Sequence, residues 1–329
     1  GAVGDDTDSF RDVLVTRNIS RNNVGWAWVS EQRDNWTYHG KAGMGYYIDH
    51  AGGITFFRNI AYANGLAGFM ASGSWYDQPV VMANNTFADS PDGFDLGIRA
   101  ALSDANTGFF AVNNIFVHLQ RFAVAVGDRR ILQGQVDLDH DLFHLVGYES
   151  WPSHTPGILA GHVDGSGYRE LPGLEDVRAI GFEADGRVGD PLFAGYDPSI
   201  TDGSWQDFRL SAASVEAIDT GGPLPERLVV LPEKFGLNDG RKGAELDRGA
   251  LEFDPDDPAA PFVIDVGPTD GSAEIVTPWA DEELPPDIEP PADAGGCGCR
   301  AVGGPGPSGC LSLLVLCVAL VAGRVRRGF

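Results

Sequence analysis

Side chains able to do acid–base chemistry gather in one stretch near the start of the chain. His39, Lys41, Asp49 and His50 lie close together in the sequence. Lys41 or His39 can serve as a general base, and Asp49 can hold a cation such as Ca²⁺. We therefore predict these four residues as candidate catalytic groups.

Aromatic and basic residues surround these four positions. Flat aromatic faces stack on sugar rings, while charged groups bond hydroxyls and carboxylates. The pattern predicts a carbohydrate site, and the alternative is a long surface loop whose rings pack on the side of the domain. The candidate substrate-binding residues are Trp26, Trp28, Arg33, Trp36, Tyr38 and Arg58.

One motif resembles a zinc site without meeting its geometry. His140 and His144 have the spacing of H-E-x-x-H, which binds zinc when both histidines share a helix face. Here the segment follows a strand, which would place the two residues roughly 13 Å apart. Asp141 also stands where that motif has its Glu. We predict no zinc site from this pair.

The elements that must position the candidate residues repeat along the chain. Five strand-like segments each end on a polar bend residue, with apolar columns five and three positions earlier. Those columns differ by two, which is the period of a strand. The segments are VLVTRNIS, ITFFRNIA, VVMANNTF, FFAVNNIF and VDLDHDLF, and their bend residues are Asn18, Asn59, Asn85, Asn114 and Asp141.

A repeat of this size cannot bury its apolar face alone and must stack on copies of itself. The chain lacks the leucine consensus of leucine-rich repeats, and propeller blades would be longer. A short amide at a bend can bond to its own bend and to the next amide in the stack. The pattern predicts a right-handed parallel β-helix of two or three strands per turn, and the alternative is five ordinary strand-to-turn junctions.

The first repeat is the longest, because the bend residues are spaced 41, 26, 29 and 27 residues apart. The extra residues lie between Trp28 and Ile54, where the catalytic candidates are. Long loops on a rigid scaffold often carry function. We expect residues 145–188 to be irregular and residues 189–253 to give a last turn and a cap.

A series of motifs near the end of the repeats carries a resemblance to a known family. Gly189–Phe193 (GDPLF), Phe208–Leu210 (FRL), Ala217–Gly221 (AIDTG) and Asp247–Phe253 (DRGALEF) resemble the closing series of bacterial β-helix proteins of the pectate-lyase-like superfamily. Leu251 departs from the aromatic residue usual there. The resemblance covers about residues 10–253 and implies an all-β solenoid.

The same resemblance implies chemistry only in outline. In polysaccharide lyases on this scaffold, a Lys or Arg removes the proton next to a uronate carboxylate, and Ca²⁺ or a basic group stabilises the intermediate. No lyase motif aligns with this chain residue by residue. No family catalytic residue is therefore carried over, and no cofactor other than a possible Ca²⁺ is indicated.

Composition divides the chain into three parts. Residues 1–253 form the predicted β-helix with its cap, and residues 254–296 are an acidic, proline-rich linker. Residues 254–294 hold twelve Asp and Glu with no Lys or Arg, within a net charge of −24 for the chain. That charge argues against nucleic-acid binding. Because the chain begins at Gly1 without a signal peptide, we expect a secretion signal and earlier turns to precede it.

Residues 297–329 combine a Gly-Cys motif, an apolar run and a basic tip. Cys297 and Cys299 precede the run Cys310–Ala322, which is followed by Arg324, Arg326 and Arg327. As a helix the run would span about 20 Å, against about 30 Å for a bilayer core. The tail resembles the MYXO-CTERM sorting signal of myxobacteria. That resemblance implies export, cell-surface anchoring through the C-terminus and a sorting protease acting near the cysteines; the alternative is an ordinary membrane anchor.

Three functions are compatible with this sequence. The first is a surface-anchored polysaccharide lyase or glycoside hydrolase. The second is a protein that binds polysaccharide without cleaving it, and the third is a non-catalytic structural or adhesion protein. The aromatic loop favours polysaccharide interaction, and it leaves catalysis open.

Overall fold

The structure of the chain is a computed structural model. It describes residues 13–23, 43–49, 52–72, 79–96, 108–127, 131, 134–146, 156–164, 167–200, 203–225, 242–254 and 256. These residues belong to one compact unit, Gly1–Ile264. The part of the chain so described is nearly all β, as predicted.

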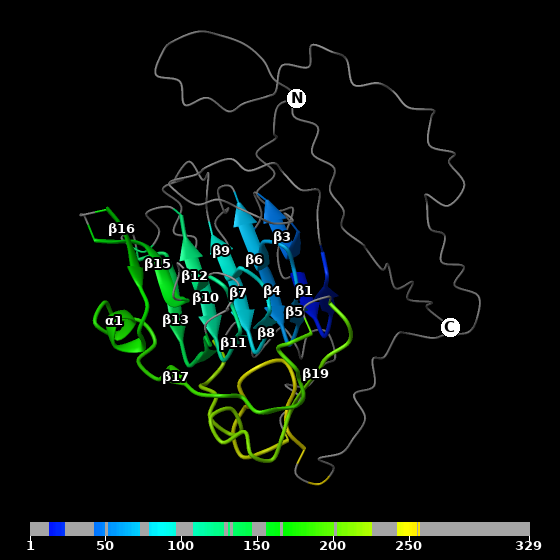
Figure 1. Cartoon of the computed structure of the whole chain (residues 1–329). Helices are drawn as coiled ribbons and strands as arrows, with labels where there is room; N and C mark the ends of the chain where they lie inside the picture. The colour runs from blue at the N-terminus through cyan, green and yellow to red at the C-terminus, as the bar shows by residue number, and fades with distance from the viewer. Residues whose placement is uncertain are drawn as a thin grey trace, which may run out of the picture. The chain divides into compact units, whose positions relative to one another are not determined.

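Each sequence repeat supplies strands to three separate sheets (Figure 1). The first sheet consists of β1 (Val13–Thr16), β4 (Ile54–Phe57), β7 (Val80–Ala83), β10 (Phe109–Val112) and β13 (Val136–Asp139). The second consists of β2 (Ile19–Arg21), β5 (Ile60–Tyr62), β8 (Thr86–Ala88), β11 (Ile115–Val117), β14 (Leu142–His144) and β17 (Arg187–Val188). The third consists of β3 (Met44–Asp49), β6 (Ala67–Ser72), β9 (Asp92–Leu96), β12 (Phe122–Val126), β15 (Gly157–Asp164) and β16 (Gly167–Leu171).

The strands pair in the register that the repeat alignment predicts. Val13 lies opposite Ile54, and Phe109 lies opposite both Val80 and Val136. These pairs are parallel, as are all pairs within the first two sheets. The predicted apolar columns are therefore confirmed as columns of stacked strands.

Residues 145–188 differ from the expectation of an irregular stretch. β15 and β16 form an antiparallel hairpin that extends the third sheet, and the short helix α1 (Leu174–Arg178) follows it. Leu159 and Leu171 are paired in the hairpin and buried in the core. The expectation was wrong for β15, β16 and α1, because the two strands form a hairpin whose pairing of Leu159 with Leu171 leaves no local period in the sequence.

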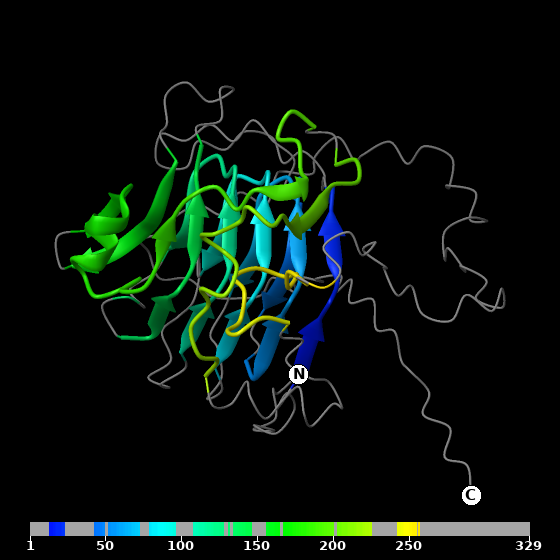
Figure 2. The ribbon, with the colours of Figure 1, turned by 90° about the horizontal axis from the view of Figure 1, so that it is seen from below.

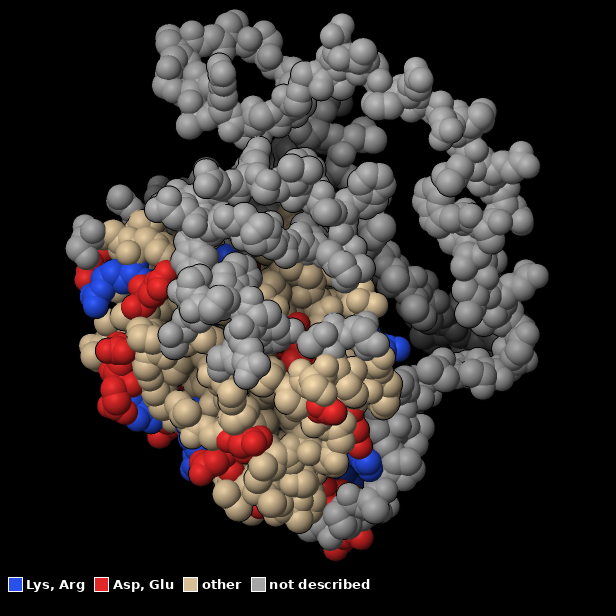
Figure 3. All heavy atoms as spheres, viewed as in Figure 1, with Lys and Arg blue, Asp and Glu red and all other residues tan. Residues whose placement is uncertain are grey.

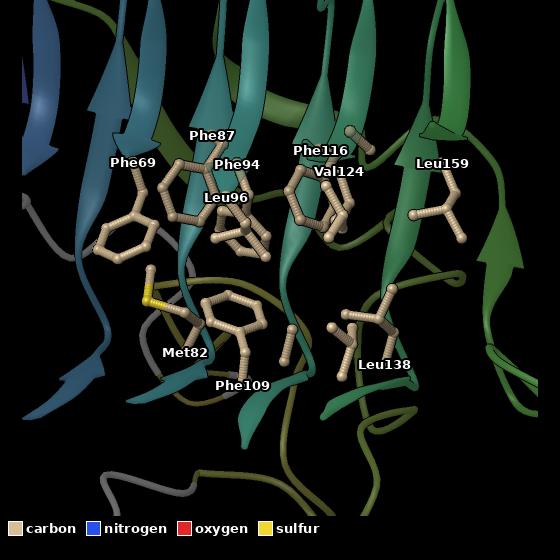
Figure 4. Packing of buried hydrophobic residues seen from close by; sticks show 14 of the residues in the cluster. Phe69, Met82, Phe87, Phe94, Leu96, Phe109, Phe116, Val124, Leu138 and Leu159 are labelled. Carbon is tan, nitrogen blue, oxygen red and sulfur yellow. The ribbon is translucent and has the colours of Figure 1, made fainter. Parts of the chain in front are cut away.

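The core between the sheets is a stack of aromatic rings (Figure 4). Phe116 lies 5.5 Å from Phe143 and 5.6 Å from Phe87, ring centre to ring centre, and both pairs are stacked. A Cβ atom on Gly93 would lie 2.5 Å from the Phe116 ring, so this glycine makes room for the stack. Burying such rings contributes about 1.5–3 kcal/mol each.

The predicted bend residues form a hydrogen-bonded ladder. The backbone N–H and the side-chain amide of Asn59 both donate to Oδ1 of Asn85, at 2.9 and 3.1 Å. Asn85 donates in the same way to Asn114. Asn18 stands at one end of the row and Asp141 at the other, accepting from Asn114. Each rung thereby satisfies polar groups that the bend would otherwise bury unpaired.

A second, shorter ladder lies five residues further along each turn. Asn23 donates to Oδ1 of Asn64, and the backbone N–H of Asn64 donates to the Ser90 hydroxyl. The next turn has Leu119 at this position, so the row of polar rungs ends there. The sequence analysis missed this ladder because its residue type changes from turn to turn.

The residues from 189 to 254 that the structure describes form what we call the strap. The strap contains the two-stranded sheet of β18 (Phe193–Gly195) and β19 (Asp207–Leu210). It lies along the outer face of the second sheet, as Figure 2 shows, where Phe208, Leu210, Ala217 and Ala250 pack with Ile60, Ile115 and Leu142. This differs from the expected cap, because the strap covers the side of the stack rather than its end.

No helix among the described residues is long and apolar enough to cross a membrane. The predicted apolar run Cys310–Ala322 lies outside those residues.

Candidate functional site

Two rows of bend residues hold the strap against the stack. In the first row, the residue before each ladder position has a positive φ, and the side chains of Arg58, Asn84 and Asn113 bond to the strap. Asn84 donates to the backbone oxygen of Asp247, and Arg58 forms an ion pair with Glu252. These contacts join turns of the stack to residues more than 160 positions later.

The second row contains the side chains best suited to acid–base chemistry. The Tyr62 hydroxyl donates to the backbone oxygen of Ser204, and the Tyr196 hydroxyl donates to Oδ1 of Asp89 at 2.6 Å. Two strands further along the second sheet, Nε2 of His144 lies 3.8 Å from a carboxylate oxygen of Asp190. We call the group Asp89, His118, His144, Asp190 and Tyr196 the seam cluster.

Bends and strand ends of three consecutive turns place the seam cluster. Asp89 follows β8, His118 follows β11, and His144 ends β14. Asp89 and His118 both have positive φ, which turns the chain out of the second sheet. Since Ala88 pairs with Val117 and Val117 with His144, the three residues belong to adjacent strands about 4.8 Å apart.

The seam cluster combines a buried acid with more accessible imidazoles. The Asp89 side chain is 1% exposed, whereas those of His118 and His144 are 17% and 27% exposed. Nδ1 of His118 lies 3.7 Å from Oδ1 of Asp89, which is too long for a direct hydrogen bond. The His118 ring also lies edge-on to Tyr196 at 6.3 Å.

Burial shifts the pKa values of the acid and the imidazole in opposite directions. It raises the pKa of Asp89 to about 7, although the Tyr196 hydroxyl bond opposes the shift. Burial lowers the pKa of His118, and the nearby His144 lowers it further. Near pH 7 the Asp89 carboxyl is therefore about half protonated, and the lowered pKa of His118 favours its neutral imidazole, a combination that can support general acid–base chemistry.

An exposed aromatic ring stands on the same stretch of the strap. Trp205 is 44% exposed and follows Ser204, which accepts the bond from Tyr62. A flat exposed ring of this kind can stack on a sugar. The sequence analysis missed the seam cluster and Trp205, because their residues come from positions spread between 89 and 205.

Most of the sequence-predicted site lies outside the described residues. This holds for Trp26, Trp28, Arg33, Trp36, Tyr38, His39, Lys41 and His50, and for the side chain of Asp49. In the chain, β3 follows Lys41 and Gly43 and ends at Asp49. At about 3.3 Å per residue, the strand places Asp49 roughly 20 Å from Gly43. Cys297 and Cys299 also lie outside the described part.

Arg58 is the one predicted substrate-binding residue whose side chain the structure describes. It is 6% exposed, pairs with Glu252, and places its guanidinium 5.2 Å from the centre of the Phe57 ring. Its observed contacts are thus with the protein itself. A role in substrate binding stays a prediction.

The two histidines of the zinc-like motif have different neighbours. His140 lies between Asp139 and Asp185, with its Nε2 3.9 and 3.7 Å from their carboxylate oxygens, whereas His144 faces Asp190. The Asp139–His140–Asp185 group has the side-chain types of a metal site. However, Oδ1 of Asp139 already accepts from two backbone N–H groups. We interpret the group as a polar cluster in which Asp139 holds the bend through these backbone hydrogen bonds.

A second pair of charged groups lies on the third sheet. The Arg121 guanidinium bonds both oxygens of Asp92, and these side chains are 10% and 0% exposed. Asp92 also accepts from the backbone N–H of Phe122. A buried, doubly bonded pair of this kind fixes the start of β9 and β12 and offers no surface to a ligand.

No family model matches this chain, and no curated protein or solved structure matches it at a significant level.

Proposed function

We propose that this chain is an exported, cell-surface protein with a right-handed parallel β-helix, which interacts with polysaccharide at the seam cluster. The observation that carries the proposal is the cluster of a buried acid, Asp89, with the Tyr196 hydroxyl and with His118, whose imidazole reaches solvent. The β-helix is supported by three stacked parallel sheets and by the asparagine ladder. Export and anchoring rest on the resemblance of the Cys297–Cys299 tail to a sorting signal.

Among carbohydrate-active enzymes, the seam cluster favours a lyase over a glycoside hydrolase. A hydrolase needs two carboxyl groups that flank the sugar. Asp89 is too buried to touch a sugar. A lyase needs a base for the proton next to the uronate carboxylate and an acid for the leaving oxygen. His118 would be the base and would take the proton, and the Tyr196 hydroxyl would be the acid, giving up its hydrogen bond to Asp89 in order to donate to the leaving oxygen.

The charge of the surface bears on which polysaccharide would bind. In the view of Figure 3, acidic and basic side chains of the described residues are interspersed rather than gathered in one basic patch. A polyanion would meet repulsion from a chain of net charge −24. We therefore expect Ca²⁺ to strengthen binding of an acidic polysaccharide by bridging carboxylates.

A second candidate, a non-catalytic structural or adhesion protein, is favoured by a specific observation. Asp89, Tyr196, His144 and Asp190 make contacts between strap and stack, and these contacts are explained by stability alone. A structural or adhesion protein of this kind would need no acid–base pair.

A polysaccharide panel tests these alternatives. The full chain would be incubated with acidic and neutral polysaccharides, with and without Ca²⁺, and followed by ultraviolet absorbance for unsaturated ends and by reducing-sugar release. We expect His118→Ala to lose at least 100-fold in turnover, a typical size for an acid–base group. Loss in Lys41→Ala but not in His118→Ala would move the site to the predicted loop.

Binding without turnover would indicate a recognition protein, with Trp205→Ala as the variant expected to weaken it. If the chain neither binds nor cleaves any polysaccharide, and Asp89→Asn changes only its stability, the result favours the structural protein and contradicts the proposal. Val215→Ala serves as a matched control for Trp205→Ala, because Val215 is also an exposed apolar residue of the strap.

A further inference from the structure

The asparagine ladder ends on a residue that cannot continue it. Oδ1 of Asp141 accepts from the backbone N–H of Asn114 at 2.7 Å and from its side-chain amide at 3.0 Å. In the next turn Glu183 takes the position of a rung, because the backbone N–H of Asp141 donates to its Oε2 at 3.2 Å. An asparagine at 141 would also donate from its side-chain amide, whereas an ionised carboxylate has no proton to donate.

Asp141 and Glu183 are both almost fully buried, with 0% and 1% of each residue exposed. Oδ2 of Asp141 and Oε1 of Glu183 have no hydrogen-bond partner among the described residues when both groups are taken as ionised. Because the backbone N–H of Asp141 donates to the Glu183 carboxylate, the two buried carboxyl groups lie next to each other. A shared proton would give the pair a donor, whereas two buried negative charges side by side would be strongly unfavourable.

The groups packed around the pair do not supply enough positive charge for two carboxylates. On the strap, Nη1 of Arg248 donates to the backbone oxygen of Asp141. After α1, Nε of Arg178 donates to the backbone oxygen of Glu183. On β13, the Asp139 carboxylate adds further negative charge.

The remaining charged neighbours are already engaged. His140 faces Asp139 and Asp185, and Arg187 of β17 forms an ion pair with Glu216. The guanidinium of Arg248 is the positive charge that interacts with both carboxyls.

We propose that Asp141 and Glu183 share one proton, and that this proton locks the end of the ladder to the segment that follows α1. The proton completes the row of donors that Asn59, Asn85 and Asn114 complete with their amides. When it is lost, repulsion drives the Glu183 side chain away and leaves the Asp141 N–H without its acceptor. The device is a pH-sensitive lock, and it does not depend on the proposed polysaccharide activity.

The direction of the pH effect follows from burial. Burial raises the pKa of Asp141 to about 7, and burial together with the Asp141 charge raises the pKa of Glu183 well above its ordinary value. The folded chain then holds protons that the unfolded chain has lost above about pH 4. The stability from the lock is complete below the ordinary carboxyl pKa and falls as the pH rises through the raised values.

Arg248 carries the effect of the lock to the strap. Besides bonding Asp141, it donates to the backbone oxygens of Thr220 and Asp185. Separation of Asp141 from Glu183 therefore disturbs Arg248, a side chain that joins the ladder end, the strap and the residues after α1. We expect the local opening to appear first at residues 183–187 and near Thr220.

The isosteric variants Asp141→Asn and Glu183→Gln test the lock, because an amide supplies the donor permanently. The full chain would be unfolded in urea from pH 5 to pH 9. For the native chain, each proton retained on folding reduces the folding constant up to tenfold per pH unit. We expect the dependence of the folding constant on pH to weaken by about one proton in either variant.

Hydrogen exchange gives an independent measurement of the same lock. We expect exchange at Asp141 and residues 183–187 to rise at least tenfold between pH 6 and pH 9 beyond the intrinsic change, and to stay level in Asp141→Asn. Asp137→Asn is the matched control, since Asp137 is an exposed acid on β13, the strand that precedes Asp141. If Asp141→Asn does not fold, Glu183→Gln decides the question alone. Equal pH dependence in the native chain and in a folded variant would overturn the proposal.

Discussion

Asn113 and Gly222 exchange two hydrogen bonds across 109 residues of sequence. The Asn113 side-chain amide donates to the backbone oxygen of Gly222 at 3.0 Å, and the Gly222 N–H donates back to Oδ1 at 2.6 Å. The Asn113 side chain thus pairs with the Gly222 backbone of the strap as the backbone of a neighbouring β-strand would. Asn113 also has a φ of 60°, a conformation that asparagine tolerates better than most residues.

The first prediction concerns this pair. Asn113→Ala removes both hydrogen bonds and leaves the buried N–H and C=O of Gly222 unpaired. It also places alanine, whose side chain cannot hydrogen-bond, at a positive φ. We expect a loss of about 2–4 kcal/mol in the free energy of unfolding, measured by urea denaturation. Asn113→Gly is the control that keeps the backbone conformation, so it isolates the two hydrogen bonds. A loss below about 0.5 kcal/mol in both variants would contradict this account.

The second prediction concerns the ion pair of Arg58 and Glu252. Both side chains are almost fully buried, so removing one partner leaves a buried charge. We expect Arg58→Leu to lose about 3–5 kcal/mol, and Arg58→Leu with Glu252→Leu to recover most of that loss. A thermal or urea unfolding series measures both. The stable double variant also tests the predicted role of Arg58 in polysaccharide binding, because it separates binding from folding.

The third prediction concerns the middle of the ladder. The Asn85 amide donates to the backbone oxygen of Phe56 and to Oδ1 of Asn114. Asn85→Asp loses those donors when ionised, and we expect a cost of about 3 kcal/mol at pH 7. Because burial favours the protonated acid, which can donate again, the cost should shrink toward pH 4. A cost that is the same at both pH values would show that the side-chain donor does not matter.

The fourth prediction concerns Asp89. Its pKa is raised to about 7 by burial, so its protonated form belongs to the folded state. The stability it contributes is present near pH 4 and falls by at most about 1.4 kcal/mol per pH unit up to pH 7. Asp89→Asn keeps an acceptor for Tyr196 and should remove that part of the pH dependence. Unfolding in urea at pH 5 and pH 7 for both proteins gives the comparison, and a fall of the same size in the variant would rule Asp89 out as its source.

Much of the scaffold was predictable from the sequence. The alignment of Val13, Ile54, Val80, Phe109 and Val136 gave the pairing register of the first sheet, since a strand that must bury one face can slip only at the cost of turning every side chain over. The polar bend column gave the row of asparagines and its Asp141 end. These features are local and recur in each repeat, so every copy supports the same prediction for the others.

The candidate site was not predictable in the same way. The sequence directed attention to residues 24–50 because a long insertion with aromatic rings stands out in a chain of short repeats. Asp89, His118 and Tyr196 stand in no motif, and His144 belongs only to the zinc-like pattern from which we predict no site. Only the stacking of three turns and the return of the strap bring the four together.

The sequence by itself thus determined the period, the strand register and the ladder, because these depend on contacts between equivalent positions one repeat apart. Tertiary structure decided where the strap lies, which bend side chains it covers, and that Glu183 meets Asp141 at the end of the ladder. The physical reason is sequence separation. A contact between positions that are not equivalent in the repeat leaves no periodic trace, and it forms only where the folded stack presents unpaired polar groups and apolar columns to the returning chain.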